Sequence, residues 1–335
     1  MRILFVGGTG TISMAITRLL AEQGHELYLL NRGNRNDALP ENVKVIKADI
    51  ENEEEVCGKL EGMEFDCVGE FIGFVPAQVE RDFRLFAGKT KQYIYISSAS
   101  AYQKPPKGYV ITEETPLENP YWEYSRNKKA CEVYLMERYE KDGFPVTIVR
   151  PSHTYDERSI PLGVHGKNGS WQVVARIMAG KPVIIHGDGS SLWTITHNSD
   201  FAKGYVGLIG KQEAIGEAFH ITSDESVSWN EIYEAIAAAL GKELKPYYVS
   251  SQMLAKLGPD YDFIGSLTGD KSNSVVFDNS KLKALVPDFA ATLSVREGVK
   301  KTVEYILQHP EYQIPDEEFD QWCDKVIETL DKVSI

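Results

Sequence analysis

The sequence has few cysteines, and it lacks long hydrophobic runs. Its four cysteines include no CxxC pair and its seven histidines include no HExxH motif, so we predict neither a disulfide framework nor a metal site. No stretch approaches the roughly 18 apolar residues that a membrane-spanning helix needs. The N-terminus also lacks the small-residue cleavage site of a signal peptide. We therefore expect a cytoplasmic protein that does not cross a membrane.

Positive charge is also scarce. Lysine and arginine number 36 against 49 acidic residues, which gives a formal net charge of -13. Nucleic acid binding depends on clustered Lys and Arg side chains, so nucleic acid is not the expected partner. The length of 335 residues and the apolar fraction of 42% are typical of a folded globular protein. A small-molecule substrate is the partner that this composition favours.

Hydrophobic patterns in the first 150 residues alternate between two kinds. Strand-type runs cover residues 2–6, 26–31, 43–47, 66–71, 93–97 and 146–150, and helix-type periodicity covers residues 11–22, 53–60, 77–86 and 122–141. Strands that alternate with helices form a parallel sheet with helices on both faces. The sequence therefore predicts an α/β fold with a Rossmann-type, doubly wound parallel sheet.

The rhythm changes after residue 150, where we expect a smaller, interleaved C-terminal substrate domain. We assign residues 1–150 and 182–222 to the dinucleotide-binding Rossmann domain, because a helix at 200–209 and a strand at 218–222 suit the same sheet, and a further strand is expected at 182–186. Residues 151–181 and 223–312 form the substrate domain, with helices at 171–178, 229–240 and 295–307.

The last segment, residues 313–335, is predicted to be a C-terminal amphipathic helix. Its apolar residues recur at helical spacing from Phe319 to Val333. We expect this helix to pack on its own subunit. The alternative is a partner-binding helix, and a homodimer stays open.

A glycine-rich segment follows the first predicted strand and opens the first predicted helix. Gly7, Gly10 and Ser13 give it the spacing GxxGxxS. Glycines at such a turn let the backbone approach a pyrophosphate, whose charge then meets free N–H groups and the positive end of the helix. A tight strand-to-helix connection is the alternative, but the strand-turn-helix context favours nucleotide binding. The expected cofactor contacts here are Gly7, Gly10, Thr11 and Ile12.

The end of the second strand bears on the choice between NAD and NADP. An acidic residue usually stands there in NAD-binding domains and binds the ribose hydroxyls. This sequence has Asn31 and Arg32 instead, and a guanidinium matches a 2′-phosphate, so NADP is favoured over NAD. Stacking on the adenine or exposure to solvent is the alternative for Arg32. Asp49 and Ile50 are expected at the adenine, with a helix N-cap as the alternative for Asp49.

A tyrosine and a lysine lie four residues apart on one predicted helix. Tyr124 is the only one of 17 tyrosines with a lysine at this spacing, which places Lys128 on the same helical face. The Lys128 ammonium can lower the pKa of the phenol and bind the cofactor ribose, and Tyr124 then becomes a usable acid or base. Serines at residues 97–100 supply hydroxyls where ligands of open α/β folds bind. Their alternative is a simple loop start.

These motifs together resemble the extended short-chain dehydrogenase/reductase superfamily, and within it the NAD-dependent epimerase/dehydratase branch. The resemblance rests on the glycine turn, on SSASAY at residues 97–102, on YSRNK at 124–128 and on the stretch from residue 186 to 200. It implies that Tyr124 is the catalytic acid/base, that Lys128 holds the nicotinamide ribose and that Ser98 is the catalytic hydroxyl. Further residues that it implies at the cofactor or substrate are Ser97, Ser100, Pro151 and His153.

Two departures from the family narrow the chemistry. Ala99 and Ser100 stand where sugar-nucleotide 4,6-dehydratases carry an Asp-Glu pair, and neither can transfer a proton, so we do not expect a dehydratase. Trp193 stands near the place of the arginine that binds a nucleotide diphosphate, and indole offers stacking area and one N–H donor. We therefore expect Trp193 to stack on a sugar ring. Arg176 is the best alternative cation for the substrate, unless it is a solvated helix residue.

A third departure lies at the end of the fourth strand, where GEFIGF occupies residues 69–74. Phe71, Ile72 and Gly73 are expected at the cofactor, and Glu70 is either there or structural. With these departures the chain resembles an atypical subgroup of the family that also contains chloroplast RNA-binding proteins. The alternative function is therefore that of a non-catalytic or RNA-binding relative. The negative net charge argues against RNA binding. The favoured function is an NAD(P)-dependent oxidoreductase or epimerase. It would transfer hydride at a carbinol or ketone of a sugar or sugar-nucleotide-like substrate.

Overall fold

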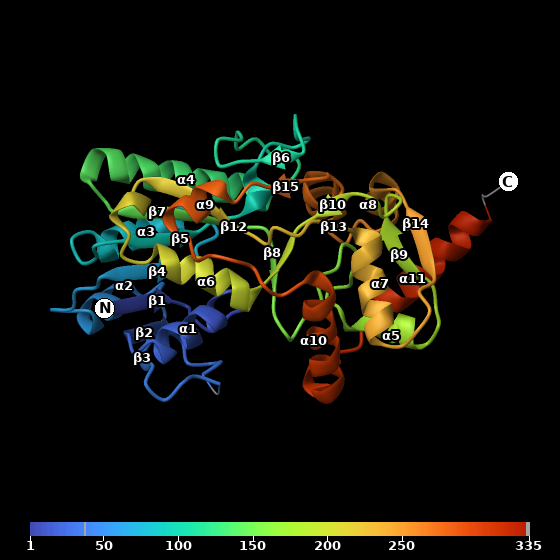
Figure 1. Ribbon diagram of the computed structural model, residues 1–335, viewed down its shortest axis with the longest axis horizontal. Coiled ribbons are helices and arrows are strands. Elements are labelled where there is room, and N and C mark those ends of the chain that lie inside the picture. Colours follow the sequence, from blue (N-terminus) through green and yellow to red (C-terminus); the bar gives the residue numbers. More distant parts are fainter. Residues whose placement is uncertain (37, 333–335) are drawn as a thin grey trace.

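The computed structural model describes residues 1–36 and 38–332 of the chain. Two lobes lie side by side along the long axis of the molecule (Figure 1). One lobe holds a seven-stranded sheet of order β12-β7-β5-β4-β1-β2-β3, in which all neighbouring strands are parallel. Its strands are β1 (Arg2–Val6), β2 (Glu26–Asn31), β3 (Lys44–Lys47), β4 (Cys67–Glu70), β5 (Tyr93–Ile96), β7 (Val146–Pro151) and β12 (Glu217–Ile221). The predicted Rossmann-type fold is confirmed.

Alternate side chains of β1 enter two different hydrophobic cores. Ile3 and Phe5 pack with α1 (Ser13–Glu22), α6 (Asn198–Leu208) and α9 (Ser280–Leu285). Leu4 and Val6 pack with α2 (Glu53–Lys59), α3 (Pro76–Phe86) and α4 (Glu123–Asp142) on the other face. A strand buried on both faces needs apolar residues at consecutive positions, which explains the continuous apolar run that opens the sequence.

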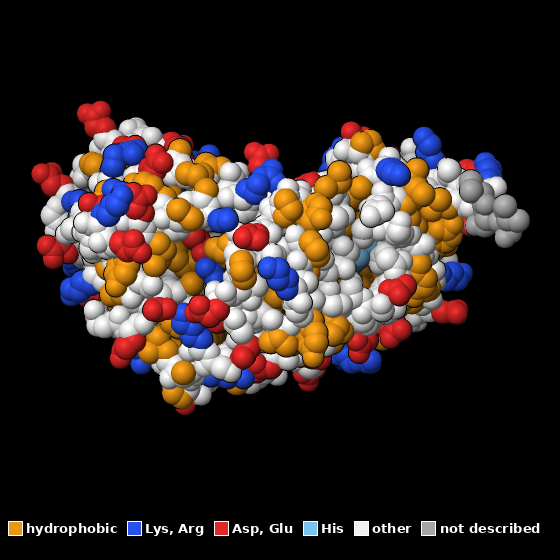
Figure 2. Space-filling view, turned by 90° about the horizontal axis from the view of Figure 1, so that it is seen from above, with side chains coloured by type: hydrophobic (Ala, Val, Ile, Leu, Met, Phe, Trp, Pro, Cys, Tyr) orange, Lys and Arg blue, Asp and Glu red, His pale blue; other side chains and the backbone are white. Residues whose placement is uncertain are grey.

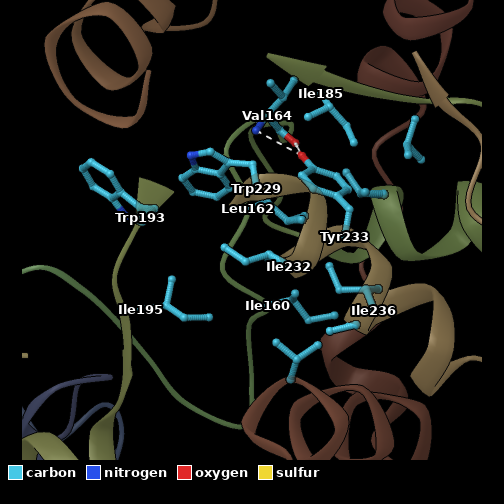
Figure 3. Close-up of a cluster of buried hydrophobic side chains, with 14 of the residues drawn as sticks. Ile160, Leu162, Val164, Ile185, Trp193, Ile195, Trp229, Ile232, Tyr233 and Ile236 are labelled. Atoms are coloured by element: carbon cyan, nitrogen blue, oxygen red, sulfur yellow. Dashed lines mark hydrogen bonds between the residues drawn. The ribbon is translucent and has the colours of Figure 1, made fainter. Parts of the chain in front are cut away.

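The second lobe surrounds a core of aromatic and aliphatic side chains (Figure 3). The rings of Trp193 and Trp229 stack with centroids 6.1 Å apart. The Tyr233 hydroxyl lies 3.5 Å from the carbonyl of Val164. The elements of this lobe are α5 (Trp171–Met178), β9 (Val183–His186), β10 (Leu192–Trp193), β13 (Val227–Ser228), α7 (Trp229–Ala239), β14 (Pro246–Val249), α8 (Ser251–Leu257), the π-helical segment η3 (Ile264–Lys271), α10 (Val295–Gln308) and α11 (Glu317–Asp331).

The strand predicted at residues 182–186 lies outside the large sheet. The strand exists as β9, but it pairs in parallel with β14 in a separate two-stranded sheet. Its residues Ile184 and Ile185 are buried in the core of the second lobe, and this burial decides where the strand packs. By contrast, α6 packs on α1 and β12 pairs with β7 at the edge of the large sheet.

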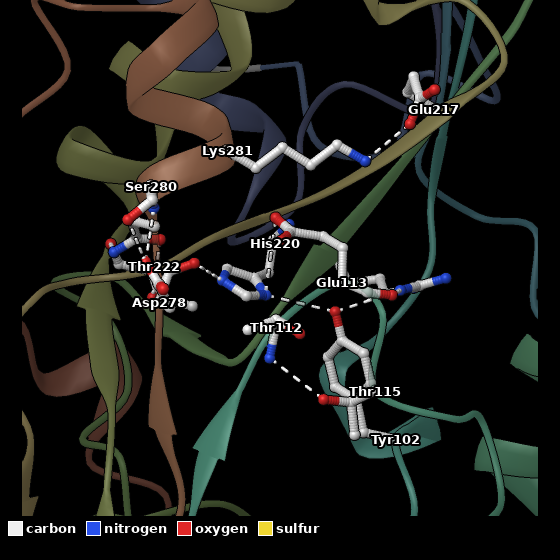
Figure 4. Close-up of polar contacts among 12 residues, drawn as sticks. Tyr102, Thr112, Glu113, Thr115, Glu217, His220, Thr222, Asp278, Ser280 and Lys281 are labelled. Atoms are coloured by element: carbon white, nitrogen blue, oxygen red, sulfur yellow. Dashed lines mark hydrogen bonds and ion pairs between the residues drawn. The ribbon is translucent and has the colours of Figure 1, made fainter.

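Short strands that the sequence analysis missed link the two lobes. β8 (His153–Tyr155) pairs with β11 (Ile195–His197), and β6 (Val110–Ile111) pairs with β15 (Val276–Phe277). A buried polar network lies beside the second pair (Figure 4). There, His220 Nε2 donates to the carbonyl of Asp278 at 2.6 Å, and Nδ1 lies 3.3 Å from the Tyr102 hydroxyl. This network fixes the loop that follows β5 against β12.

The C-terminal helix α11 packs on its own chain. Phe319, Cys323 and Val326 are buried in the core of the second lobe. Val333, the last apolar residue of the predicted helix, lies outside the described residues. No helix within residues 1–36 and 38–332 is long and apolar enough to cross a membrane.

Candidate active site

A cavity of about 1040 Å³ lies at the carboxyl ends of the parallel strands, where the two lobes meet. The Rossmann lobe contributes the glycine turn, the loops after β2, β3 and β5, and two side chains of α4. The second lobe contributes Trp193 and Asp270. The predicted residues that line the cavity are Gly7, Gly10, Thr11, Ile12, Asn31, Arg32, Asp49, Ile50, Phe71, Ile72, Ser97, Ser98, Ser100, Tyr124, Lys128, Pro151, His153 and Trp193.

The glycine turn has the shape that a dinucleotide pyrophosphate requires. Gly7 and Gly8 adopt φ angles of +98° and +95°, which residues with a Cβ rarely adopt. A Cβ on Gly10 would meet only the Ser13 side chain, at 3.6 Å, so this part of the turn is open toward the cavity. Among the described residues, no side chain caps the N-terminus of α1. The amides there can therefore bind phosphate oxygens.

Ser13 occupies the position of the third glycine in the turn. Its hydroxyl accepts a hydrogen bond from the Gly10 amide at 2.9 Å. The side chain is buried at the first residue of α1, beside the turn. A small hydroxyl residue therefore fits where other dinucleotide-binding turns have glycine.

Two arginines line the end of the cavity beside β2. Arg32, which the sequence singled out, and Arg35, which it missed, are both exposed in the same loop. The Asn31 side chain accepts a hydrogen bond from the Gly33 amide at 2.8 Å, and this bond shapes the loop. Arg35 could have been predicted from the sequence, because it places a second guanidinium three residues after Arg32. Together these arginines can hold a 2′-phosphate.

Asp49 lies at the cavity but does not cap a helix. Its carboxylate accepts a hydrogen bond from the Glu51 amide at 3.1 Å within the loop after β3. The N-cap of α2 is Asn52, whose side chain accepts from the Glu55 amide. The N-cap alternative for Asp49 is therefore wrong.

Tyr124 and Lys128 face the cavity from consecutive turns of α4. The Lys128 ammonium donates hydrogen bonds of 2.7 Å to the carbonyls of Gly73 and Ile96. Burial lowers the pKa of Lys128 to about 8. Burial also raises the pKa of the Tyr124 phenol, and Asp270 raises it further, while the Ser98 hydroxyl lowers it. The net shift of the Tyr124 pKa in this structure is therefore upward, opposite to the predicted lowering.

The serine segment after β5 forms a chain of hydroxyls that ends at Ser98. The Ser125 hydroxyl donates to Ser100 at 2.8 Å, and the hydroxyls of Ser100 and Ser98 lie 2.8 Å apart. Ser98 is also close enough to Tyr124 to lower the pKa of the phenol. The Ser97 hydroxyl is instead bonded to the buried carboxylate of Glu132. Of these serines, Ser98 is the one placed to act with Tyr124.

The loop after β4 serves the site through its backbone. Phe71 and Ile72 line the cavity, whereas Gly73 does not line it and contributes its carbonyl to Lys128. The Glu70 carboxyl is fully buried and accepts a hydrogen bond from the Ile72 amide. Burial and the neighbouring Asp82 raise the pKa of Glu70 well above its usual range. Glu70 is therefore a structural residue that shapes this loop.

The structure overturns the prediction for Arg176. Its guanidinium is 1% exposed and pairs with Asp320 at 2.6 Å and with Asp324 at 2.8 Å, both on α11. Its Nε atom donates to the Pro182 carbonyl at 2.9 Å. Arg176 is not among the residues that line the cavity. It is neither a substrate cation nor a solvated side chain, because it fastens α11 to α5.

Other lining residues escaped the sequence analysis. Trp122 lies two positions before Tyr124, Phe74 follows the β4 loop, and Asp270 ends η3. Phe74 covers the Lys128 ammonium, which lies 4.7 Å from the centre of its ring. The apolar rings at Trp122 and Phe74 could have been noticed beside the motifs. Asp270 could not be predicted as a site residue, because its segment is distant in sequence from the other site residues and contains no motif.

The sequence is similar to a known family and to known proteins. The sequence profile of the NAD dependent epimerase/dehydratase family matches residues 3–222. A 2′-dehydrokanamycin reductase from Streptomyces kanamyceticus is 25% identical over 289 residues, which are 86% of this chain and 80% of the reductase. The chloroplast stem-loop binding protein of 41 kDa b from Arabidopsis thaliana is 27% identical over 253 residues, 72% of this chain and 63% of that protein.

The fold recurs in solved structures. A UDP-glucose 4-epimerase from Thermotoga maritima superposes with a TM-score of 0.74 at 21% identity, covering 92% of this chain and 99% of that chain. A dTDP-glucose 4,6-dehydratase from Bacillus anthracis gives a TM-score of 0.74 at 19% identity, with 93% and 98% covered. These structures share the architecture of both lobes.

Proposed function

The chain belongs to the NAD dependent epimerase/dehydratase family, and on that premise we propose that it transfers hydride at a carbinol or ketone carbon of a sugar-like substrate. The observation that carries the proposal is the single cavity that joins the glycine turn to Tyr124, Lys128 and Ser98. A cofactor at the turn and a reacting oxygen at Tyr124 can occupy this cavity together.

The residues that would hold a nicotinamide dinucleotide are spread along the cavity. The glycine turn and the amides of α1 would bind the pyrophosphate, and Asp49 and Ile50 would contact the adenine. Arg32 and Arg35 would pair with a 2′-phosphate, which favours NADP. Pro151 and His153 would border the nicotinamide, and burial lowers the pKa of His153 to about 3, so this imidazole is neutral. When bound, the nicotinamide supplies the carbon that exchanges hydride.

Proton transfer falls to Tyr124. Its hydroxyl would give a proton to the oxygen of a ketone that is being reduced, or take the proton from a carbinol that is being oxidised. The Ser98 hydroxyl, oriented by Ser100, would donate a hydrogen bond to the same oxygen. The positive charge of Lys128, 5.8 Å from the centre of the Tyr124 ring, favours the phenolate that forms during reduction.

The same residues serve a reductase and an epimerase. Release of the product after one hydride transfer is the reaction of a reductase, whereas return of the hydride to the opposite face of a ketone gives an epimer. Elimination of water needs a further acid and base, and Ala99 and Ser100 cannot supply them, so we do not propose a dehydratase. Similarity to a reductase over 86% of the chain supports the first outcome.

RNA binding is the second candidate function, because one relative is a chloroplast stem-loop binding protein. The charge of this chain speaks against it. The formal net charge is -13, and Lys and Arg side chains are interspersed with Asp and Glu over the face in Figure 2. Fluorescence anisotropy with a labelled stem-loop RNA should show no binding at physiological salt. Micromolar binding that weakens with salt would favour the RNA function.

The cofactor provides the test of the proposed function. The full-length protein is purified, denatured, and any released nucleotide is identified by chromatography. We expect the protein to retain or bind NADP, and NADP to quench its tryptophan fluorescence on titration. Retained NAD would indicate an epimerase, because an epimerase keeps its cofactor through turnover. Failure of both nucleotides to bind at millimolar concentration would contradict the proposed function.

A further inference from the structure

Three buried charged side chains gather beside the cavity, which Asp270 lines and which Lys104 and Lys271 approach from behind its wall, and none belongs to a motif of the sequence. Lys104, Asp270 and Lys271 are 4%, 7% and 8% exposed. Asp270 and Lys271 end η3 in the second lobe, whereas Lys104 lies in the loop after β5. Asp270 lines the cavity, and the Lys104 ammonium is 3.7 Å from its Oδ1 atom. We call these residues the Lys104–Asp270–Lys271 cluster.

The protein pairs these charges only in part. Within the described part of the chain, neither ammonium donates a hydrogen bond, and the closest charged contact in the cluster is the 3.7 Å ion pair of Lys104 with Asp270. The Lys271 ammonium lies 5.8 Å from the centre of the Trp122 ring, and that of Lys104 lies 5.5 Å from the Trp193 ring. Buried charges without hydrogen bonds are costly, so a polar ligand group in the cavity would stabilise them.

Burial acts against the charge of every member. It lowers the pKa values of Lys104 and Lys271 and raises that of Asp270. Such strain is typical of sites that await a charged partner. Two exposed ion pairs of this chain, Lys167 with Glu318 and Lys300 with Glu304, are equally long at 3.7 Å, but their groups are solvated, whereas those of the cluster are buried.

Tight packing holds the cluster beside Tyr124. A Cβ on Gly265 of η3 would come within 2.1 Å of the Trp122 ring, so only glycine permits this approach. Asn119 donates hydrogen bonds to the carbonyls of Gly269 at 2.6 Å and Ser100 at 2.7 Å. These contacts tie η3 to the start of α4 and to the serine segment. π-helical turns are often found at functional sites.

The signs of the charges select the ligand. Two ammonium groups against one carboxylate leave the cluster with one net positive charge. A ligand ammonium that approached Asp270 would also meet Lys104 and Lys271 and be repelled. A phosphate ester carries nearly two negative charges and would exceed the positive charge available. One carboxylate matches it, and Trp122 and Trp193 line the same cavity.

We infer that the Lys104–Asp270–Lys271 cluster binds the carboxylate of a sugar acid and thereby selects the substrate. This inference rests on the proposed function, because it assigns the substrate class of the same cavity. Lys104 and Lys271 donate hydrogen bonds to the carboxylate oxygens, and Asp270 accepts one from a neighbouring sugar hydroxyl. The sugar ring then lies in the cavity that Trp122 and Trp193 line, with a carbinol or ketone at Tyr124.

Calorimetric titration of the full-length protein with four sugars tests the inference. The sugars are D-glucuronate, D-glucose, D-glucosamine and D-glucose 6-phosphate, each with and without NADP. Charge-assisted hydrogen bonds should make glucuronate bind about tenfold or more tighter than glucose. Glucosamine should bind no tighter than glucose. Tightest binding of glucosamine, or tighter binding of glucose 6-phosphate than of glucuronate, would overturn the assignment.

Variants locate the binding group. Lys104→Met and Lys271→Met should each remove most of the preference for glucuronate over glucose, and Lys104→Gln and Lys271→Gln replace them if the methionine variants do not fold. Lys107→Met is the matched control, because Lys107 is exposed in the same loop as Lys104. A preference that survives in both cluster variants, or that disappears in Lys107→Met, would contradict the inference.

The same titrations separate this inference from the proposed function. NADP binding should be unchanged in the cluster variants, since none of the three residues belongs to the glycine turn or to the loops after β2 and β3. Normal NADP binding without any preference for glucuronate would refute the sugar-acid subsite alone. Absence of nucleotide binding would refute the proposed function, while the titrations without NADP still decide the preference for the sugar acid.

Discussion

The Lys128 ammonium lies 5.8 Å from the centre of the Tyr124 ring, yet it donates its hydrogen bonds to the backbone carbonyls of Gly73 and Ile96. Those carbonyls belong to the loop after β4 and to the end of β5. The lysine therefore joins two strand ends of the sheet and holds a positive charge near the phenol. Charge and geometry at Tyr124 depend on the same side chain.

Replacement of Tyr124 by phenylalanine tests its role as acid and base. The change removes one hydroxyl and leaves the glycine turn intact, so turnover should fall by roughly 100-fold or more. The affinity for the nucleotide should stay within a few fold. Steady-state kinetics measures the turnover, and nucleotide titration measures the affinity. Tyr121→Phe, an exposed tyrosine of the same segment, is the control, and turnover of Tyr124→Phe within about tenfold of wild type would refute the assignment.

Lys128 should make stability depend on pH. Its pKa is lowered by burial from 10.5 to about 8 in the folded chain. Below about pH 8 both states carry the proton, and the folded state bears the cost of a buried charge. Between about pH 8 and 10.5 the folded lysine is neutral while the unfolded one stays charged. The unfolded state then binds more protons, so this group adds stability as the pH rises.

The measurement compares wild type with Lys128→Met in urea at several pH values. The free energy of unfolding of wild type relative to Lys128→Met should increase between about pH 8 and 10.5. Lys129→Met provides the control, because Lys129 is exposed on the same helix. A difference that is flat or that decreases over this range would mean that the lysine keeps its charge.

Cofactor preference should depend on the two arginines of the β2 loop. Arg32→Asp introduces an acceptor for ribose hydroxyls and repels a 2′-phosphate, so the ratio of NADP to NAD affinities should fall by about tenfold or more. Arg35→Ala should weaken NADP binding and leave NAD binding nearly unchanged. Fluorescence titrations with both nucleotides measure the ratios. Strong preference of the wild type for NAD would show that neither arginine contacts a phosphate.

Local patterns were sufficient to predict the Rossmann lobe. Alternating strand and helix periodicity located the strands of the large sheet, because each βα unit packs on its sequence neighbours. The partner of the strand at residues 182–186 could not be predicted, because periodicity records burial and not the partner strand. The apolar pattern of β9 suits a fully buried strand in either sheet. Its pairing with β14 in the second lobe shows which sheet it joins.

Some residues of the candidate site could likewise be predicted from the sequence, and others could not. Residues near the glycine turn and Tyr124 carry motifs, since the proposed cofactor binding and proton transfer would demand fixed spacings. Asp270 and Lys104 meet through tertiary packing across 166 positions of sequence and follow no fixed spacing. Arg176 misled the analysis for the same reason, because its partners Asp320 and Asp324 are on a distant helix.

Arg176 should matter for stability and not for the substrate. Arg176→Met leaves the carboxylates of Asp320 and Asp324 without their buried partner, and the free energy of unfolding should fall by about 1–3 kcal/mol. Lys181→Met is the control, because this exposed lysine contacts the same two carboxylates and should cost less than about 1 kcal/mol. Urea unfolding measures both. Weaker substrate binding in Arg176→Met, with unchanged stability, would restore its predicted role at the cavity.

Gly265→Ala should disturb the substrate half of the site while sparing the cofactor half. The new methyl group would lie 2.1 Å from the Trp122 ring in the present geometry, so either the ring or η3 must move. Trp122 also donates a hydrogen bond to Asp262 at 2.6 Å, and Tyr124 lies two residues further along α4. Movement at this contact therefore displaces Asp270 and Tyr124 relative to each other.

We expect Gly265→Ala to lower kcat/KM by about tenfold or more, since small displacements of reacting groups are costly, and to lower stability by about 1–3 kcal/mol through overpacking. NADP affinity should stay within a few fold of wild type. Gly108→Ala is the control, because a Cβ there would meet no atom within 4 Å. Normal kcat/KM in Gly265→Ala would mean that the packing of η3 on Trp122 does not position the site, and a matching loss of NADP affinity would indicate general unfolding.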